Sequence, residues 1–237
     1  MAAVNNGFTF KQFHINHDRC AMKVGTDGVL LGAWADVTGA KTLLDLGTGT
    51  GLIALMLAQR TAGHGRISAV EIDRDAFWQA TENVRRSPWA DNITLYHQDI
   101  AEFAAKCGEK FDRITANPPY FNAGSDCRSE SRSRARYLLE QGHEDWLNLA
   151  ADCLSETGTI HFILPFDAGE TLRKRTALYC VHRCEVVTKA GKPPQRLLLT
   201  FAKQARMMRQ SRLTIYDEHH RYRAEFIALI KDFYLKY

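Results

Sequence analysis

Residues 42–60, "TLLDLGTGTGLIALMLAQR", constrain the fold more than any other stretch of the chain. A short apolar run ends in an acid, three alternate glycines follow, and a segment of good helix formers comes next. This order predicts a buried strand, a tight loop and a helix. A buried strand joined to a helix in this way is typical of a parallel sheet that is covered on both faces.

The same alternation continues along the chain. Further strands are expected at "RISAVEID", "NITLYHQDI", "FDRITANPPY" and "TIHFILP", with "CEVVTKA" and "QRLLLTFAK" as a closing pair. Helices fill the intervals, and one of them, "EDWLNLAADCLSETG", is expected to end at Gly158. The sequence therefore predicts an α/β protein with a Rossmann-like, doubly wound sheet of seven mostly parallel strands.

The whole chain, residues 1–237, is interpreted as one domain. Residues 35–205 form its core, preceded by a cap segment at 1–34 and followed by a helical extension at 206–237. In that extension, "DEHHRYRAEFIALIKDFYLKY" is read as a helix whose aromatic residues dock onto the core.

Composition is that of an ordinary globular protein, with 45% hydrophobic and 24% charged residues. No apolar run reaches the length of a membrane span, and the first residues lack the pattern of a secretory signal, so a cytoplasmic protein with no membrane partner is expected. The six cysteines have no metal-ligand spacing, and no metal site is predicted.

Charge is distributed unevenly. Up to Cys127 there are 12 Lys plus Arg against 14 Asp plus Glu, whereas the residues from Arg128 onward hold 19 against 13. The second half is therefore basic, which is compatible with a nucleic-acid partner and also with an ordinary solvated surface.

The glycine loop predicts a ligand at the carboxyl end of the first core strand, where doubly wound sheets bind their ligands. Gly47, Gly49 and Gly51 follow a G-x-G-x-G pattern, which differs from the G-x-G-x-x-G of dinucleotide sites and favours a ligand without a pyrophosphate. Asp45, before the loop, suits a cationic group such as an amino-acid ammonium. The alternative is a tight turn with no ligand.

Two further acids follow strands. Glu71, with Ile72, is placed to accept hydrogen bonds from both ribose hydroxyls of an adenosine, or it is a surface acid that starts a helix. Asp99 is placed to accept from an adenine amino group, with Ile100 supplying an apolar contact, or it is a helix cap.

The sequence "NPPY" predicts a rigid loop at the end of another strand, because proline cannot donate to a sheet and disfavours helix before it. The side-chain oxygen of Asn117 and the carbonyl of Pro118, held in direction by Pro118 and Pro119, offer two acceptors for one planar amino group. Holding both N–H bonds would free the nitrogen lone pair to act as a nucleophile. Tyr120 offers a face on which a base could stack. The alternative is a turn that merely ends the strand.

"DLGTGTG", Glu71, Asp99 and "NPPY", in this order, resemble the class I S-adenosylmethionine-dependent methyltransferases that carry the [D/N]-P-P-[Y/F/W] amino-methylation motif. A closer resemblance, carried by "NGFTFKQFHINHDRCAMKVGTDGVLLGAWA", "SPWA", "NPPY" and "KDFYL", is to the bacterial valine tRNA adenine-N6 methyltransferase family. It spans essentially the whole chain. The resemblance implies S-adenosylmethionine as cofactor and the adenosine 3′ of the anticodon in the valine tRNA anticodon stem-loop as target.

The same resemblance implies that Lys23, Thr26 and Asp27 fold over the methionine end of the cofactor, although Thr26-Asp27-Gly28 could equally be a plain helix cap. Two basic groups are candidates for contacts with tRNA phosphates. The first, Arg128, Arg132, Arg134 and Arg136, could instead be a solvated loop; the second is Lys189, Lys192 and Arg196.

Rival functions share the four-residue motif. A protein-glutamine N5-methyltransferase and a ribosomal-RNA guanine N2-methyltransferase use the same motif, because their acceptor amino groups pose the same chemical problem. A DNA adenine methyltransferase would need a target-recognition domain, which the sequence does not indicate. From another class, the chain could be a non-catalytic RNA-binding module.

Overall fold

A computed structural model describes residues 7–20, 23–119 and 142–236 of the chain. Tyr120 and the first basic group, Arg128, Arg132, Arg134 and Arg136, lie outside the described residues, so the predictions made for them stay predictions.

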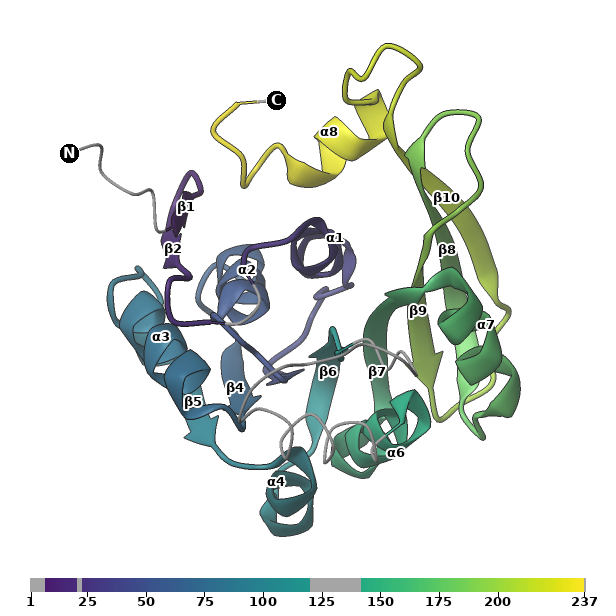
Figure 1. Cartoon of the computed structure of the whole chain (residues 1–237). Helices are drawn as coiled ribbons and strands as arrows, with labels where there is room; N and C mark the ends of the chain where they lie inside the picture. The colour runs from purple at the N-terminus through teal and green to yellow at the C-terminus, as the bar shows by residue number, and fades with distance from the viewer. Residues whose placement is uncertain (1–6, 21–22, 120–141, 237) are drawn as a thin grey trace, which may run out of the picture.

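A mixed sheet forms the centre of the molecule (Figure 1). Its strands are β3 (Thr42–Leu46), β4 (Arg66–Glu71), β5 (Ile93–His97), β6 (Phe111–Ala116), β7 (Leu154–Pro165), β8 (Tyr179–Lys189), β9 (Arg196–Ala202) and β10 (Arg209–Tyr216). They lie in the order β10-β8-β9-β7-β6-β3-β4-β5, and only β9 runs antiparallel to its neighbours. This confirms the predicted Rossmann-like class I fold.

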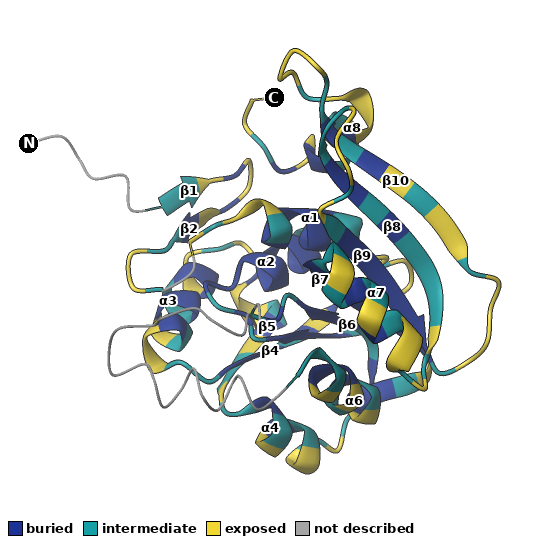
Figure 2. Ribbon diagram, turned by 45° about the vertical axis from the view of Figure 1, so that its right-hand side comes forward, coloured by how far each residue is buried: buried dark blue, intermediate teal, exposed yellow. Residues whose placement is uncertain are grey.

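Helices cover both faces of this sheet. One face carries α1 (Thr26–Trp34), α2 (Leu52–Arg60), α3 (Arg74–Arg85) and α8 (Ala224–Ile230), and the other carries α4 (Ile100–Lys106), α6 (His143–Cys153) and α7 (Phe166–Arg175). A 3-10 turn at Ala90–Asn92 precedes β5. Each face has its own apolar core, because strand residues alternate between them: Leu43 packs into the first core and Leu44 into the second. The central strands β3, β6, β7 and β9 are mostly buried, whereas β10 at the edge of the sheet is partly exposed (Figure 2).

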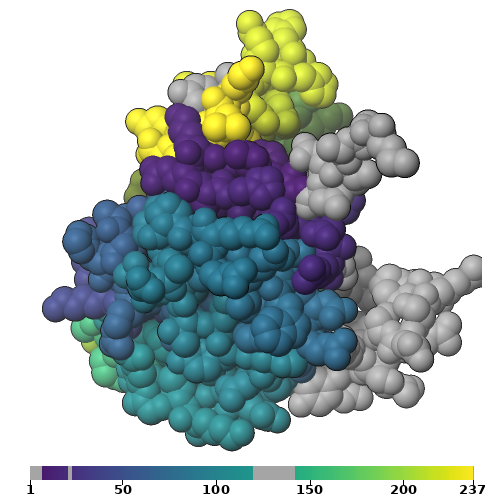
Figure 3. All heavy atoms as spheres, turned by 90° about the vertical axis from the view of Figure 1, so that its left-hand side faces the viewer, coloured from purple at the N-terminus to yellow at the C-terminus, as the bar shows by residue number. Residues whose placement is uncertain are grey.

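The N-terminal residues form a small hairpin, β1 (Gly7–Thr9) and β2 (His14–Asn16), which the sequence analysis did not anticipate. It lies between the body of the molecule and the C-terminal residues (Figure 3). Phe10 is the centre of this contact, since its ring lies 4.6 Å from that of Phe13 and 6.0 Å from that of Tyr234.

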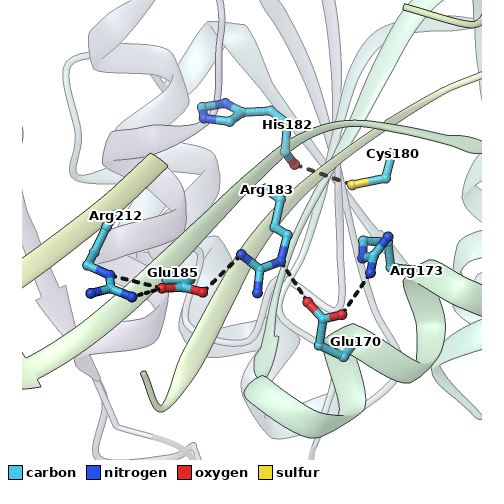
Figure 4. Close-up of polar contacts among 7 residues, drawn as sticks. All are labelled: Glu170, Arg173, Cys180, His182, Arg183, Glu185 and Arg212. Carbon is cyan, nitrogen blue, oxygen red and sulfur yellow. Dashed lines mark hydrogen bonds and ion pairs between the residues drawn. The ribbon is translucent and has the colours of Figure 1, made fainter. Parts of the chain in front are cut away.

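Among the described residues, the central sheet has eight strands, one more than the seven expected. Residues 209–216, placed in the helical extension, form the parallel edge strand β10. Leu213 and Ile215 alternate into the core, and Arg212 lies directly opposite Glu185 of β8 and is paired with it. Glu185 also forms an ion pair with Arg183. Arg183 in turn pairs with Glu170 of α7, which also pairs with Arg173 of the same helix (Figure 4). This chain of ion pairs fastens the edge strand to the sheet and its covering helix.

Two helix predictions were wrong in extent. Helix α6 ends at Cys153, and β7 already begins at Leu154. Gly158 lies within that strand, where a Cβ would come 2.9 Å from the Phe111 carbonyl, so its lack of a side chain permits close approach to β6. In the C-terminal segment, only Ala224–Ile230 is helical, as α8.

Candidate active site

The three glycines between β3 and α2 have different tasks. All have positive φ, at 66° for Gly47, 57° for Gly49 and 81° for Gly51. Residues that carry a Cβ rarely adopt this backbone conformation. A Cβ on Gly47 would come 2.7 Å from the Trp146 ring, whereas a Cβ on Gly49 would meet nothing within 4 Å. Gly47 is therefore required by packing, and Gly49 presents its open side to space that a ligand can occupy.

Asp45 is completely buried, and the threonines beside it engage both of its carboxylate oxygens. The Thr48 hydroxyl donates to Oδ2 at 2.6 Å, and the Thr115 hydroxyl donates to Oδ1 at 2.8 Å. Burial raises the pKa of Asp45 to about 6, against these hydrogen bonds. The predicted direct contact with an ammonium group does not fit this placement, because the carboxylate has no accessible surface. Asp45 instead shapes the glycine loop and ties it to β6.

Glu71 lies at the end of β4, against the glycine loop, and is 8% exposed. Its Oε2 accepts from the Gly49 N–H at 2.8 Å, and its Oε1 accepts from the Asp73 N–H at 2.8 Å. Burial raises the pKa of Glu71, while these backbone hydrogen bonds oppose the rise. The carboxylate thus lies next to Gly49, and its contact with a ribose stays a prediction.

Asp99 caps α4, because its Oδ1 accepts from the backbone N–H groups of Ala101 and Glu102 at 2.7 and 3.3 Å. The helix cap is therefore present, and the predicted contact with adenine would have to use the other carboxylate oxygen, Oδ2. Ile72 is half-buried after β4, and Ile100 is buried at the start of α4.

Asn117 follows directly after β6, whose last residue Ala116 lies opposite Leu46 of β3. The two strands therefore deliver the proline loop and the glycine loop side by side at the carboxyl edge of the sheet. Asn117 is half-buried and Pro118 is buried. The geometry brings the predicted amide and the predicted cofactor loop together.

Sequence reasoning missed two residues that hold this arrangement. Thr115 is fully buried and joins β6 to Asp45 through its hydroxyl. His143, the first residue of α6, hydrogen-bonds to the Pro119 backbone, where the only polar group is the carbonyl. Burial lowers the pKa of His143, which favours a neutral ring. A threonine two residues before "NPPY" was a readable signal, whereas nothing local marked His143.

The family model described as "Methyltransferase small domain" matches residues 24–165. The chain is 61% identical over 237 residues to a Pasteurella multocida protein named tRNA1(Val) (adenine(37)-N6)-methyltransferase, with 100% of each chain covered. A Haemophilus influenzae protein of the same name is 56% identical, with 98% of this chain and 100% of the relative covered. The chain belongs to this methyltransferase family.

Solved structures place the fold in the same class. A predicted O-methyltransferase from Agrobacterium tumefaciens superposes with a TM-score of 0.68 at 18% identity, covering 87% of this chain and 96% of that one. TrmN from Thermus thermophilus gives a TM-score of 0.51 at 20% identity, covering 69% and 44%. At these identities the likeness concerns the methyltransferase fold alone.

In this methyltransferase, the predicted cofactor residue Asp27 and the predicted RNA residue Arg196 meet in one ion pair, with Nε and Oδ2 at 3.0 Å. Thr26 lies beside them in the first turn of α1, and Lys23 is exposed before it. Lys189 lies at the end of β8, where its Nζ is 3.0 Å from the His220 Nε2, and Lys192 is exposed in the following turn. The second basic group therefore gathers near the same edge of the sheet as the glycine loop.

Within the described ranges, no three His, Cys, Asp or Glu side chains are grouped so that they could hold a metal ion. None of the helices described is both long and apolar enough to cross a bilayer.

Proposed function

We propose that this methyltransferase transfers the methyl group of S-adenosylmethionine to the exocyclic N6 amino group of an adenosine in tRNA. The target we infer is the adenosine immediately 3′ of the anticodon in valine tRNA, in line with the relatives' printed names. The reaction would take place in the cytoplasm, where its tRNA substrate is. The observation that carries the proposal is the register of β3 and β6, which sets Asn117 beside the glycine loop.

The chain's own residues fit the cofactor. Gly49 leaves open space next to Glu71, whose carboxylate would accept hydrogen bonds from the ribose hydroxyls. Asp99 and Ile100 would contact the adenine, and Ile72 would add an apolar contact beside them. Lys23, Thr26 and Asp27 would lie toward the methionine end. When bound, S-adenosylmethionine supplies an electrophilic methyl group on a sulfonium.

Asn117 and Pro118 would position the nucleophile. An adenine amino group is a poor nucleophile because its lone pair is spread into the ring. The Asn117 side-chain oxygen and the Pro118 carbonyl would each accept one of its N–H bonds, which directs the lone pair toward the methyl group. Pro119, held by His143, fixes the loop, and Tyr120 would stack on the base.

The decisive experiment distinguishes RNA from protein as the acceptor. The purified protein is incubated with methyl-labelled S-adenosylmethionine and total RNA, or total protein, from a strain lacking the gene. Labelled N6-methyladenosine in valine tRNA is the expected product, and a valine tRNA transcript with guanosine at position 37 should accept no label. Label in a protein fraction, or in methylguanosine, would replace the proposal with one of its rivals.

A further inference from the structure

A cavity of about 230 Å³ lies between α1, the turn joining β8 to β9, and the segment from β10 to α8. Three tyrosines line it, Tyr216, Tyr222 and Tyr234, together with Thr26, Asp27 and Arg196. None of the roles assigned above uses the tyrosines.

The tyrosines form a prearranged aromatic wall. The rings of Tyr216 and Tyr222 are stacked, with centroids 4.9 Å apart and planes 23° apart. A hydrogen bond with the Tyr216 phenol, followed by burial, raises the pKa of Tyr222 to about 12, and burial also raises that of Tyr234. The Tyr222 and Tyr234 phenols therefore stay neutral, as hydrogen-bonding groups on flat apolar rings.

Basic groups border the same wall. Lys189 lies opposite Tyr216 in the pairing of β8 with β10, and its Nζ is bonded to His220, whose ring centroid is 6.1 Å from that of Tyr216. On the other side, Arg196 lines the cavity and is paired with Asp27. Flat rings bordered by cations suit a nucleobase and its phosphate better than they suit an apolar or a cationic ligand.

The cavity is close to the methyl-transfer site. Ala116, next to Asn117, lies opposite Phe162 of β7, and Pro165 at the end of β7 lies opposite Arg196 of β9. Since β6, β7 and β9 are consecutive neighbours, Arg196 lies about two strand spacings, roughly 10 Å, to the side of the proline loop at the same edge. An RNA loop that presents one base to Asn117 has neighbouring nucleotides within reach of this cavity.

We propose that the tyrosine cavity binds a second unpaired nucleobase of the tRNA substrate, next to the target adenosine in the anticodon loop. The inference rests on the proposed function, since it requires tRNA to be the substrate. Unpaired loop bases are commonly splayed out and stacked on aromatic side chains, and such contacts fix the register in which the target enters. The cavity would thus set which nucleotide reaches Asn117.

The first test removes the flat ring while keeping apolar volume. Tyr222→Leu should raise the KM for valine tRNA by about 5- to 100-fold, the range expected for loss of base stacking. Its affinity for S-adenosylmethionine should stay unchanged. The matched control is Tyr179→Leu, because Tyr179 is 51% exposed at the opposite end of β8. Equal KM values for the two variants, at equal melting temperatures, would overturn the proposal.

A second test uses the unmodified protein, so it does not depend on how the variant folds. Valine tRNA anticodon stem-loops carrying 5-iodouridine at one loop position at a time are bound to the protein and irradiated, and crosslinked peptides are identified by mass spectrometry. One position flanking the target should crosslink to Tyr216 or Tyr222. Crosslinks confined to other segments, with binding intact, would refute the cavity's role alone. If no stem-loop or tRNA binds, the proposed function fails with it.

Discussion

The two halves of the sheet are organised in different ways. Around β3, β4 and β6, short sequence motifs set the structure, and the polar side chains bond to backbone or hydroxyl groups of adjoining loops and strands, as Glu71 does with Gly49. Around β8 and β10, side chains that are distant in the sequence hold the structure through ion pairs, such as Glu185 with Arg183 and Arg212. The motifs predicted the first half, whereas in the second half the sequence predicted β8 and β9 but not β10 or the ion pairs that hold it.

The difference corresponds to a division of roles: the first half (the motif half) holds the residues proposed for methyl transfer, and the ion pairs of the second half (the ion-paired half) stabilise the sheet. We expect substitutions of the motif residues to disturb the reaction, and substitutions of the ion-paired residues Arg183, Glu185 and Arg212 to change the free energy of unfolding.

The largest effect is expected at Asn117. Asn117→Ala removes one of the two acceptors of the target amino group, so kcat should fall by about 100- to 1000-fold, as for loss of one oriented catalytic hydrogen bond. The dissociation constant of S-adenosylmethionine, measured by calorimetry, should hardly change. Asn117→Asp keeps an acceptor oxygen and serves as the matched control with more residual activity. A large loss of cofactor binding in Asn117→Ala would contradict the role assigned.

The glycine loop allows a sharper comparison within the motif half. Both Gly47→Ala and Gly49→Ala strain a positive φ by about 1 kcal/mol. Only Gly47→Ala also drives a methyl group into Trp146, which adds about 1–3 kcal/mol of overpacking. Urea denaturation should rank Gly47→Ala as the less stable variant, while Gly49→Ala should lose more cofactor affinity. Equal destabilisation would show that the two glycines are interchangeable.

The ion-paired half should respond in stability and not in rate. Glu185→Gln leaves Arg183 and Arg212 without their shared carboxylate, and because the Arg183 and Glu185 side chains are only 13% and 18% exposed, the loss should be about 1–3 kcal/mol. Arg212→Met should cost less, since Arg212 is 64% exposed and Glu185 keeps Arg183. Arg209→Met, at an exposed position of the same strand, is the control. A changed kcat in Glu185→Gln would break the division between the halves.

The smallest expected effect is a change in how the free energy of unfolding varies with pH. The pKa of Asp45 in the folded state is about 6, above the ordinary value of about 3.9, so its contribution makes the unfolding free energy fall as pH rises between these values. Hydrogen bonding to Arg212 lowers the pKa of Glu185, so its contribution is lost as pH falls below about 4.3. Asp45→Asn should flatten the first dependence, and Glu185→Gln the second, in urea titrations at several pH values. Overlapping profiles for the two variants would argue against both assignments.

Local sequence predicted what local interactions decide. Helix α2 begins and ends where its helix-forming residues do, between Gly51 and Thr61. Strand β10 was missed because its register depends on Glu185, which lies 27 positions before Arg212. The aromatic residues after it suggested one long helix, yet Tyr222 bridges back to Tyr216 instead of joining that helix.

The site was predictable to the same degree. The positions of Gly49, Glu71 and Asn117 follow from strand ends, and the structure brings them to one edge. The task of Asp45 was not readable, because its partner Thr115 lies 70 positions away and a buried carboxylate looks the same in sequence as an exposed one. Asp27 and Arg196 are paired although they lie 169 positions apart in the sequence, so no spacing rule could have predicted this contact.

The N-terminal hairpin has a consequence for how the chain is made. The Lys11 backbone N–H donates to the Phe233 carbonyl at 2.8 Å, and its Nζ donates to the carbonyl of Lys231, 220 positions later. During synthesis these two bonds can form only after Lys231 and Phe233 have left the ribosome. A chain truncated before Lys231 would lose both of these bonds, whereas the hairpin would keep its bond to α3, from the Asn16 N–H to the Asn83 side-chain oxygen at 2.9 Å.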